Sequence, residues 1–108
     1  MGPALPPPLE AYFRAVNAHD ADRIAACFTA DAVVRDERQD QVGRDAIRAW
    51  ADETGRRYRH TVELLACEAD AGRTVVTASV TGDFPGSPIE LRYFFGLADG
   101  LIHELKIG

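Results

Sequence analysis

The chain has 108 residues, of which 46% are hydrophobic and 27% are charged. This length and composition are typical of one small globular domain. Twelve Lys and Arg residues against 17 Asp and Glu residues give a net charge of −5, so phosphate backbones and anionic lipid surfaces would repel the domain. No apolar run approaches the length that spans a bilayer. We therefore expect neither nucleic acid nor a membrane as a partner.

The two cysteines, Cys27 and Cys67, are isolated and form no CxxC pair. Together with the lack of a signal-peptide pattern, isolated thiols favour a reducing cytoplasm. Neither cysteine has a positively charged partner nearby in the sequence, so we expect small buried hydrophobic residues rather than nucleophiles.

The opening residues, MGPALPPP, are rich in proline and predict an extended arm over residues 1–8, ahead of a single domain over residues 9–108. Apolar residues then recur at helical spacing. They predict an amphipathic helix that begins near Pro8, with an apolar face formed by Leu9, Tyr12, Phe13 and Val16. Asp20 fits the N-cap of a second short helix, whose apolar stripe comprises Ile24, Cys27 and Phe28.

A half-buried strand is predicted next, and one of its faces ends in a carboxylate, because Ala32 and Val34 lie in the same phase as Asp36. Such a carboxylate is costly unless it is paired, solvated in a pocket or used in chemistry. The polar residues that follow indicate a turn. A third helix is predicted over residues 43–55, with Gly55 as its C-terminal stop and an inward face formed by Ile47, Trp50 and Ala51.

The rest of the chain contains four β-rich runs separated by turn signals, at residues 59–70, 73–84, 89–98 and 101–107. Strands joined by such short links pair antiparallel. Helices followed by a meandering sheet define the α+β class. We expect one strongly curved sheet wrapped around the three helices.

Alternation along these strands predicts a largely apolar inner face. The apolar residues expected there include Val62, Leu64, Ala66, Val76, Ala78, Val80, Phe84, Leu91, Phe95, Leu97 and Leu105, whereas Cys67 and Ile102 fall on the outer face. Four polar residues interrupt the inner face, namely Asp36, His60, Tyr93 and His103. A pocket is predicted where these four residues lie.

Three segments resemble the nuclear transport factor 2-like superfamily, which includes the SnoaL-like polyketide cyclases, the ketosteroid isomerases and scytalone dehydratase. They are YFRAVNAHDADRIAACFTADAVVRD at residues 12–36, GRDAIRAW at 43–50 and RYFFGLADGLIHELKI at 92–107. The resemblance implies a conical, cystatin-like α+β barrel, in which a mixed or antiparallel sheet bends around three N-terminal helices and a cavity opens at the wide end. It implies that residues 9–108 form a SnoaL-like domain. This fold hosts several activities as well as proteins with no chemistry.

The ketosteroid isomerases give the best local match. In them a first-helix tyrosine precedes an N-A-x-D corner, as Tyr12 precedes NAHD, and a general-base aspartate follows an A-x-V-x-D strand, as Asp36 does. The resemblance therefore implies catalytic roles for Asp36 and Tyr12. Their third catalytic residue is an acid in a P-I-D strand, which corresponds by motif to Glu90 in SPIE. Strand phase instead favours Tyr93 inward and Glu90 on the surface, whereas a β-bulge would turn Glu90 inward.

Each candidate also has a structural interpretation. Asp36 is either a base in a cavity or a solvated strand end, and Tyr12 either donates a hydrogen bond to a substrate carbonyl or only packs its ring. His103 and His60 are candidates for ligand contact, although a lone inward histidine is usually a hydrogen-bonded core residue. The remaining candidates for core or cavity wall are Trp50, Phe28 and Phe95.

The histidines lack metal-ligand spacing, and the sequence contains neither a Gly-rich phosphate loop nor a nucleophile elbow. We therefore expect no metal and no cofactor. Our first hypothesis is a hydrophobic pocket for a small carbonyl compound, with acid-base chemistry by Asp36 assisted by Tyr12, Tyr93 or His103. The second is a non-catalytic ligand-binding or dimerisation module, because the outer face of the sheet is a mixed Thr, Ser and apolar surface suited to a homodimer.

Overall fold

The computed structural model of the protein describes residues 4–108. Part of the predicted proline-rich arm, residues 1–3, lies outside this range. Helix α1 (Pro7–Asn17) begins at Pro7, one residue before the expected start. Proline is suited to the first turn because the N–H that it lacks would have no partner within the helix. The predicted apolar face of α1 is confirmed as buried.

Helix α2 (Ala21–Ala26) begins after Asp20, whose carboxylate accepts a hydrogen bond from the backbone N–H of Arg23 at 3.1 Å. This confirms the predicted N-cap. The helix is shorter than the apolar stripe suggested, because strand β1 (Phe28–Asp36) already begins at Phe28. Ala32 and Val34 on β1 are fully buried and Asp36 is half-buried, as the alternation predicts.

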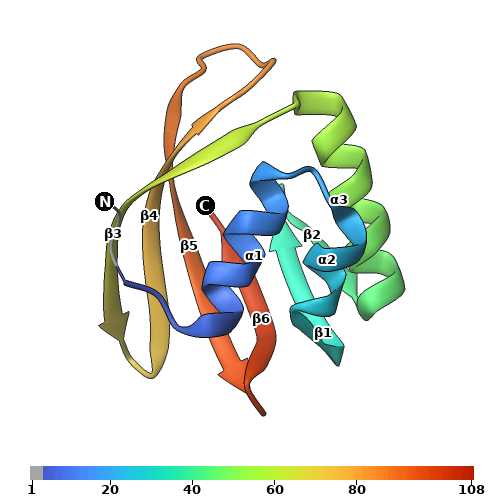
Figure 1. Ribbon diagram of the computed structural model, residues 1–108, viewed down its shortest axis with the longest axis vertical. Coiled ribbons are helices and arrows are strands. Elements are labelled where there is room, and N and C mark those ends of the chain that lie inside the picture. Colours follow the sequence, from blue (N-terminus) through green and yellow to red (C-terminus); the bar gives the residue numbers. More distant parts are fainter. Residues whose placement is uncertain (1–3) are drawn as a thin grey trace.

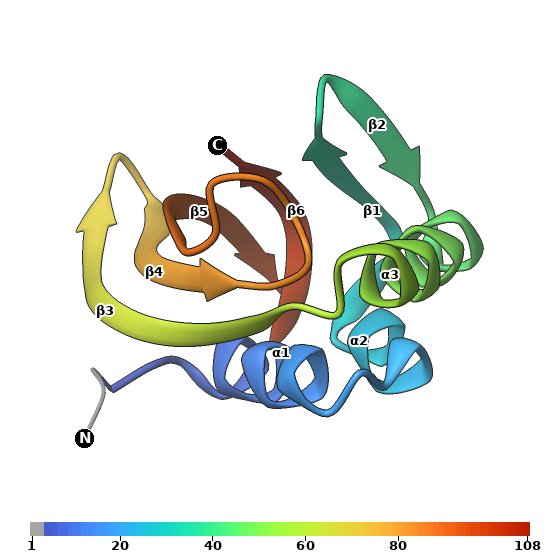
Figure 2. The same ribbon diagram turned by 90° about the horizontal axis from the view of Figure 1, so that it is seen from above.

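Six strands form one mixed sheet in the order β2-β1-β6-β5-β4-β3. The four predicted β-runs are confirmed as β3 (Thr61–Asp70), β4 (Arg73–Thr81), β5 (Ile89–Ala98) and β6 (Leu101–Ile107), each antiparallel to the next. The last strand, β6, returns to pair parallel with β1. The α+β class and the curved sheet are therefore confirmed. Figure 1 shows the three helices in front of the sheet, and Figure 2 shows β3 curling back toward α1.

One strand was not predicted. The polar segment after Asp36 contains β2 (Gln39–Val42), which pairs antiparallel with β1. Glu37 and Arg38 form the connecting two-residue turn with φ angles of 51° and 64°, as such tight hairpins require. The strand lies at the edge of the sheet, where its largely exposed side chains need no apolar alternation. The pattern that identifies half-buried strands was therefore missing.

Helix α3 (Arg44–Tyr58) runs three residues past the predicted stop at Gly55 and ends where Arg59 adopts a left-handed conformation with φ of 47°. A glycine inside a helix costs only about 1 kcal/mol relative to alanine, so it need not end one. The prediction that the helix ends at Gly55 is wrong. No helix among residues 4–108 is both long enough and apolar enough to cross a bilayer.

Two β-bulges reverse the side-chain phase that simple alternation predicts. In β3 the pairing with β4 shifts between Leu64 and Ala66, so Cys67 packs against the core instead of facing outward. Between β5 and β6, Gly96 pairs with Glu104 and Leu97 with Ile102, which leaves His103 as the extra residue. Ile102 is therefore fully buried, and the predictions for the faces of Cys67 and Ile102 are wrong. Ala66 and Leu97, which were predicted to point inward, are exposed.

Candidate active site

A cavity of about 920 Å³ lies between the inner face of the sheet, helices α1 and α3, and the loop after β4. Binding sites for small molecules typically have volumes of roughly 300–1,000 Å³. Much of the wall is apolar and is formed by Val16, Ile24, Ala51, Val80, Phe84 and Leu91. Of the residues predicted for the site, Tyr12, Asp36, Trp50, His60 and Tyr93 line the cavity together.

Asp36 is the carboxylate at the end of β1, and α3 supplies its partner. The indole Nε1 of Trp50 donates a hydrogen bond to Oδ2 of Asp36 at 3.1 Å. Trp50 lies one helical turn after the buried Ile47, on the side of α3 that faces the sheet. The two elements thus hold the carboxylate at the cavity wall with one oxygen bound by the indole.

The environment makes Asp36 a stronger base than an exposed aspartate. Partial burial raises the pKa of its carboxyl group, and the charge of Glu37 raises it further. The hydrogen bonds from Trp50 and from the backbone of Glu37 act in the opposite direction, because they stabilise the charged form. The net result is a raised pKa, with desolvation as the largest cause.

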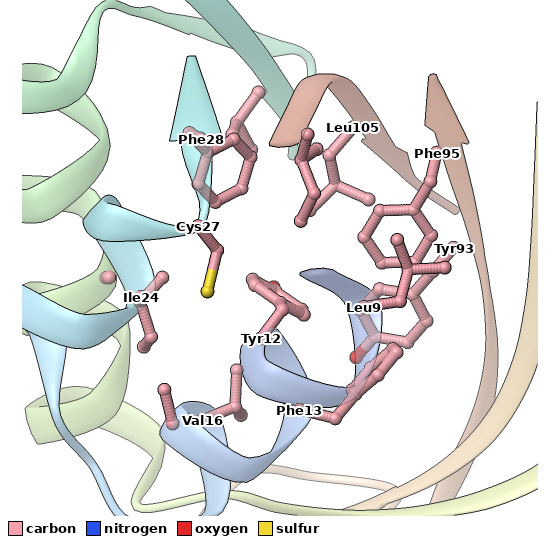
Figure 3. Packing of buried hydrophobic residues seen from close by; sticks show 14 of the residues in the cluster. Leu9, Tyr12, Phe13, Val16, Ile24, Cys27, Phe28, Tyr93, Phe95 and Leu105 are labelled. Carbon is pink, nitrogen blue, oxygen red and sulfur yellow. The ribbon is translucent and has the colours of Figure 1, made fainter. Parts of the chain in front are cut away.

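Tyr12 projects from α1 into a cluster of aromatic rings (Figure 3). Its ring makes edge-to-face contacts with Phe13, Phe28 and Phe95 at centroid distances of 5.0, 5.9 and 5.6 Å. Burial raises the pKa of the Tyr12 hydroxyl well above its usual value, so this group remains a hydrogen-bond donor. Tyr12 therefore packs its ring in the core and also lines the cavity.

Tyr93, on β5, is the second phenol at the cavity. Its side chain is buried, and burial raises the pKa of its hydroxyl. Glu90 pairs with Ser79 of β4 and is exposed, so the predicted choice of Tyr93 over Glu90 as the inward residue is confirmed. Residues 4–108 contain three tyrosine hydroxyls. The hydroxyl of Tyr58 donates a hydrogen bond to Oε1 of Glu37 at 2.9 Å. The hydroxyls of Tyr12 and Tyr93 have no hydrogen-bond partner among these residues.

His60 lies at the start of β3 and lines the same cavity, beside His19 from the corner after α1. The two imidazole centroids are 6.4 Å apart. Burial lowers the pKa of His60, and the nearby His19 lowers it further. The ring is therefore neutral at physiological pH.

His103 does not belong to this cavity, and its prediction as an inner-face residue is wrong. The bulge on β6 turns its half-exposed side chain away, so that Nδ1 lies 3.2 Å from the Thr29 hydroxyl and 3.7 Å from Asp31. Phe28 and Phe95 are fully buried in the core and do not line the cavity. Both rings pack edge-to-face against the ring of Tyr12.

Several charged and polar residues of the cavity were not predicted. Tyr58 donates its hydrogen bond to Glu37 and so links the end of α3 to the β1–β2 turn. On α3, Arg56 pairs with Asp52 at 3.3 Å. Glu37, Tyr58 and Arg56 were not predicted because the turn was not recognised as a hairpin and α3 was expected to end at Gly55. Asp52 lies within the predicted helix but outside its predicted inward face. Within residues 4–108 no group of three or more His, Cys, Asp or Glu side chains could hold a metal ion.

A curved six-stranded sheet, three helices and a cavity containing Asp36 together define the nuclear transport factor 2-like fold class. The chain belongs to the SnoaL-like domain family, which matches residues 9–105. A candidate polyketide cyclase from Sinorhizobium meliloti is 36% identical, with 96% of this chain and 95% of that protein covered and a TM-score of 0.91.

Two further structures show the fold alone. A protein with a ketosteroid isomerase-like fold from Catenulispora acidiphila, in complex with trimethylamine, is 16% identical with a TM-score of 0.84, covering 97% of this chain and 86% of that one. A cystatin-fold protein from Novosphingobium aromaticivorans is 18% identical with a TM-score of 0.79, covering 99% of both chains. Comparison with curated proteins gave no match.

Proposed function

We propose that the cavity binds a small, mostly hydrophobic carbonyl compound and that Asp36 transfers a proton next to the carbonyl group. One observation carries the proposal: a half-buried carboxylate with a raised pKa faces the same apolar cavity as two phenols without protein partners. A base, an oxyanion donor and an apolar wall are the parts that enolate chemistry needs.

In the proposed reaction, ionised Asp36 removes a proton from the carbon beside the carbonyl. The C–H electron pair forms the enolate, and the negative charge moves to the carbonyl oxygen. Tyr12 or Tyr93 donates a hydrogen bond to this oxygen, and their high pKa values keep them protonated. In a β,γ-unsaturated ketone the enolate is conjugated with the C=C bond, so protonated Asp36 returns the proton to the γ carbon, which moves the double bond, completes the isomerisation and regenerates the base. In a substrate with a second carbonyl group, the enolate carbon instead attacks that carbonyl carbon, and protonated Asp36 gives its proton to the resulting alkoxide, which completes a cyclisation.

The direct test compares the Asp36→Asn variant with the wild type on a panel of cyclic enones and aromatic ketones. Asparagine keeps an oxygen for the Trp50 indole but cannot accept the substrate proton, so turnover should fall by about 10²–10⁴-fold while binding is retained. His103→Asn is the matched control, since His103 lies outside the cavity. Equal turnover by the wild type and Asp36→Asn would contradict the proposal.

A second candidate function is non-catalytic binding of an organic cation. The carboxylates of Asp36 and Glu37 lie at a cavity that also contains the rings of Trp50 and Tyr93, and aromatic faces together with carboxylates attract alkylammonium groups. The relative bound to trimethylamine motivates a titration with that amine. Binding that Asp36→Asn abolishes, without turnover of any ketone, would favour this second function.

The expected partners and location stay predictions. The outer face of the sheet carries Leu65 and Phe94, which are partly exposed, and we propose that it pairs two copies of the chain in a homodimer. Sedimentation equilibrium would test this, because a monomer at high concentration would contradict it.

The cytoplasmic location and the lack of nucleic acid and membrane partners, expected from the cysteines and the charge, need fractionation and binding measurements.

A further inference from the structure

Two polar groups stand on different walls of the cavity. Asp36 ends β1, whereas His60 immediately precedes β3. Four inter-strand steps separate β1 from β3 in the sheet, and the curvature of the sheet brings both groups to one cavity. A ligand that binds with its carbonyl group near Asp36 can therefore meet a second polar group at another wall.

The orientation of the His60 ring limits what it can offer a ligand. Its Nδ1 atom is sealed from solvent and has no hydrogen-bond partner among the residues that the structure describes. His60 nevertheless lines the cavity, so the accessible edge of the ring is the one that carries Nε2. A proton on Nδ1 would bury an N–H group without an acceptor, which is costly. The neutral ring therefore carries its proton on Nε2.

Surrounding contacts hold the backbone on both sides of His60 in place. A Cβ atom at Gly82 would lie 2.6 Å from the carbonyl oxygen of Tyr58 and 3.0 Å from Cβ of His60, so only glycine allows the strand end to pass this close. Two residues after His60, the side-chain amide of Asn17 holds the backbone of Val62. It donates a hydrogen bond to the carbonyl oxygen of Val62 at 3.0 Å and accepts one from the N–H of Val62 at 2.7 Å. Such support from backbone and side chains is what a preorganised binding group needs.

We propose that Nε2–H of His60 is a hydrogen-bond donor that recognises a second oxygen atom on the ligand, remote from the carbonyl group at Asp36. The inference rests on the proposed function for the place of the carbonyl, and it narrows the ligand class to carbonyl compounds with a distal acceptor oxygen, such as an ether, hydroxyl or second carbonyl. An imidazole that is neutral and donates from Nε2 favours an acceptor over an ammonium group.

The test uses two pairs of ketones that differ in length, each pair matched in shape. The short pair is para-methoxyacetophenone and para-ethylacetophenone, and the long pair is acetylbiphenyl with a methoxy or an ethyl group on the far ring. An ether oxygen accepts a hydrogen bond and a methylene does not. We expect the methoxy member of at least one pair to bind about tenfold more tightly by calorimetry, as one added hydrogen bond would give.

The His60→Phe variant should bind both members of the pair equally, because phenylalanine keeps a ring but has no N–H donor. His60→Gln, which regains a donor, should recover part of the preference, and His103→Phe should leave it unchanged. Nitrogen NMR of the three histidines in the wild type should place the His60 proton on Nε2, and this measurement does not depend on any variant. A proton on Nδ1, no binding by any probe, or no methoxy preference in the wild type would each overturn the proposal.

The result is separable from the outcome at Asp36. The methoxy preference is measured as binding, so it should persist in Asp36→Asn even though turnover is lost. A preference without any Asp36-dependent turnover would leave the His60 site standing and contradict the proposed reaction. Turnover that depends on Asp36, without any methoxy preference, would support the proposed reaction and contradict the proposed role of His60.

Discussion

The end of β1 and the start of β6 lie in two paired strands of one sheet, yet only the end of β1 presents its polar side chain to the cavity. The pairing of β1 with β6 shifts between Phe28 and Val33, but β1 alternates regularly from Ala32 into Asp36, which is held at the cavity by the indole of Trp50. β6 contains a bulge, and His103 lies in solvent beside Thr29. The contrast teaches that the regularity of the strand, as much as the residue type, decides whether a polar group reaches the cavity.

The largest difference should be seen in stability at the bulge itself. Ile102 is fully buried and the adjacent His103 is exposed. Ile102→Ala should therefore lower the free energy of unfolding by about 2–5 kcal/mol, whereas His103→Ala should change it by less than about 0.5 kcal/mol. Urea denaturation of both variants measures this. Equal losses would mean that the strand has no bulge at this point.

A smaller effect is expected where α3 meets Asp36. Trp50→Phe removes the N–H that stabilises the charged carboxylate, so the pKa of Asp36 should rise further. The variant should also lose about 1–3 kcal/mol of stability at neutral pH, from the hydrogen bond and from packing. Carboxyl NMR titration reports the pKa directly, and a decrease would show that the indole does not bind the ionised form.

The pH dependence of stability should reveal the cost of keeping Asp36 charged. Because burial raises its pKa in the folded state, the folded protein binds this proton more tightly than the unfolded chain, and stability falls as pH rises through the window between the two pKa values. The Asp36→Asn variant has no ionisable group at this position, so it does not lose this stability. The free energy of unfolding of the variant minus that of the wild type should therefore increase across that pH window and then level off. Denaturation at a series of pH values measures this difference. A constant difference would indicate an unshifted carboxyl group.

The smallest change is expected at the rim of the cavity. Tyr58→Phe deletes the exposed hydrogen bond to Glu37, and surface substitutions of this kind usually alter stability by no more than about 0.5 kcal/mol. Thermal denaturation should therefore hardly distinguish this variant from the wild type. A large loss would instead show that the link between α3 and the β1–β2 turn holds the hairpin in place.

Periodicity was sufficient to predict three helices, five of the six strands and the inward placement of Asp36, Tyr12 and Tyr93. These residues lie on elements that alternate or repeat without interruption. Strand alternation also predicted the curved sheet and a pocket, and the resemblance to a known superfamily added the conical shape with a cavity at its wide end. The catalytic roles of Asp36 and Tyr12 stay predictions, since geometry alone does not test them.

The errors about which face a side chain occupies come from features that break the period. A bulge inserts one residue and exchanges the two faces beyond it, as happened for Cys67 and His103. Gly96 was an available signal for the second bulge, because a glycine inside a strand often marks one, and a Cβ there would lie 2.7 Å from Cγ of Glu104. The bulge at Leu65 has no comparable sequence signal.

The amide of Asn17 has a consequence for association of the chain. β3 is an edge strand, and the unpaired backbone groups of such a strand can recruit a foreign strand. By bonding both the N–H and the carbonyl of Val62, Asn17 takes the place of a neighbouring strand at that residue. The open stretch that remains carries Glu63 and Asp70 at its two ends. An antiparallel copy aligned over residues 63–70 would place Asp70 opposite Glu63, and these like charges would repel. The first helix thus helps to keep the sheet from growing into an aggregate.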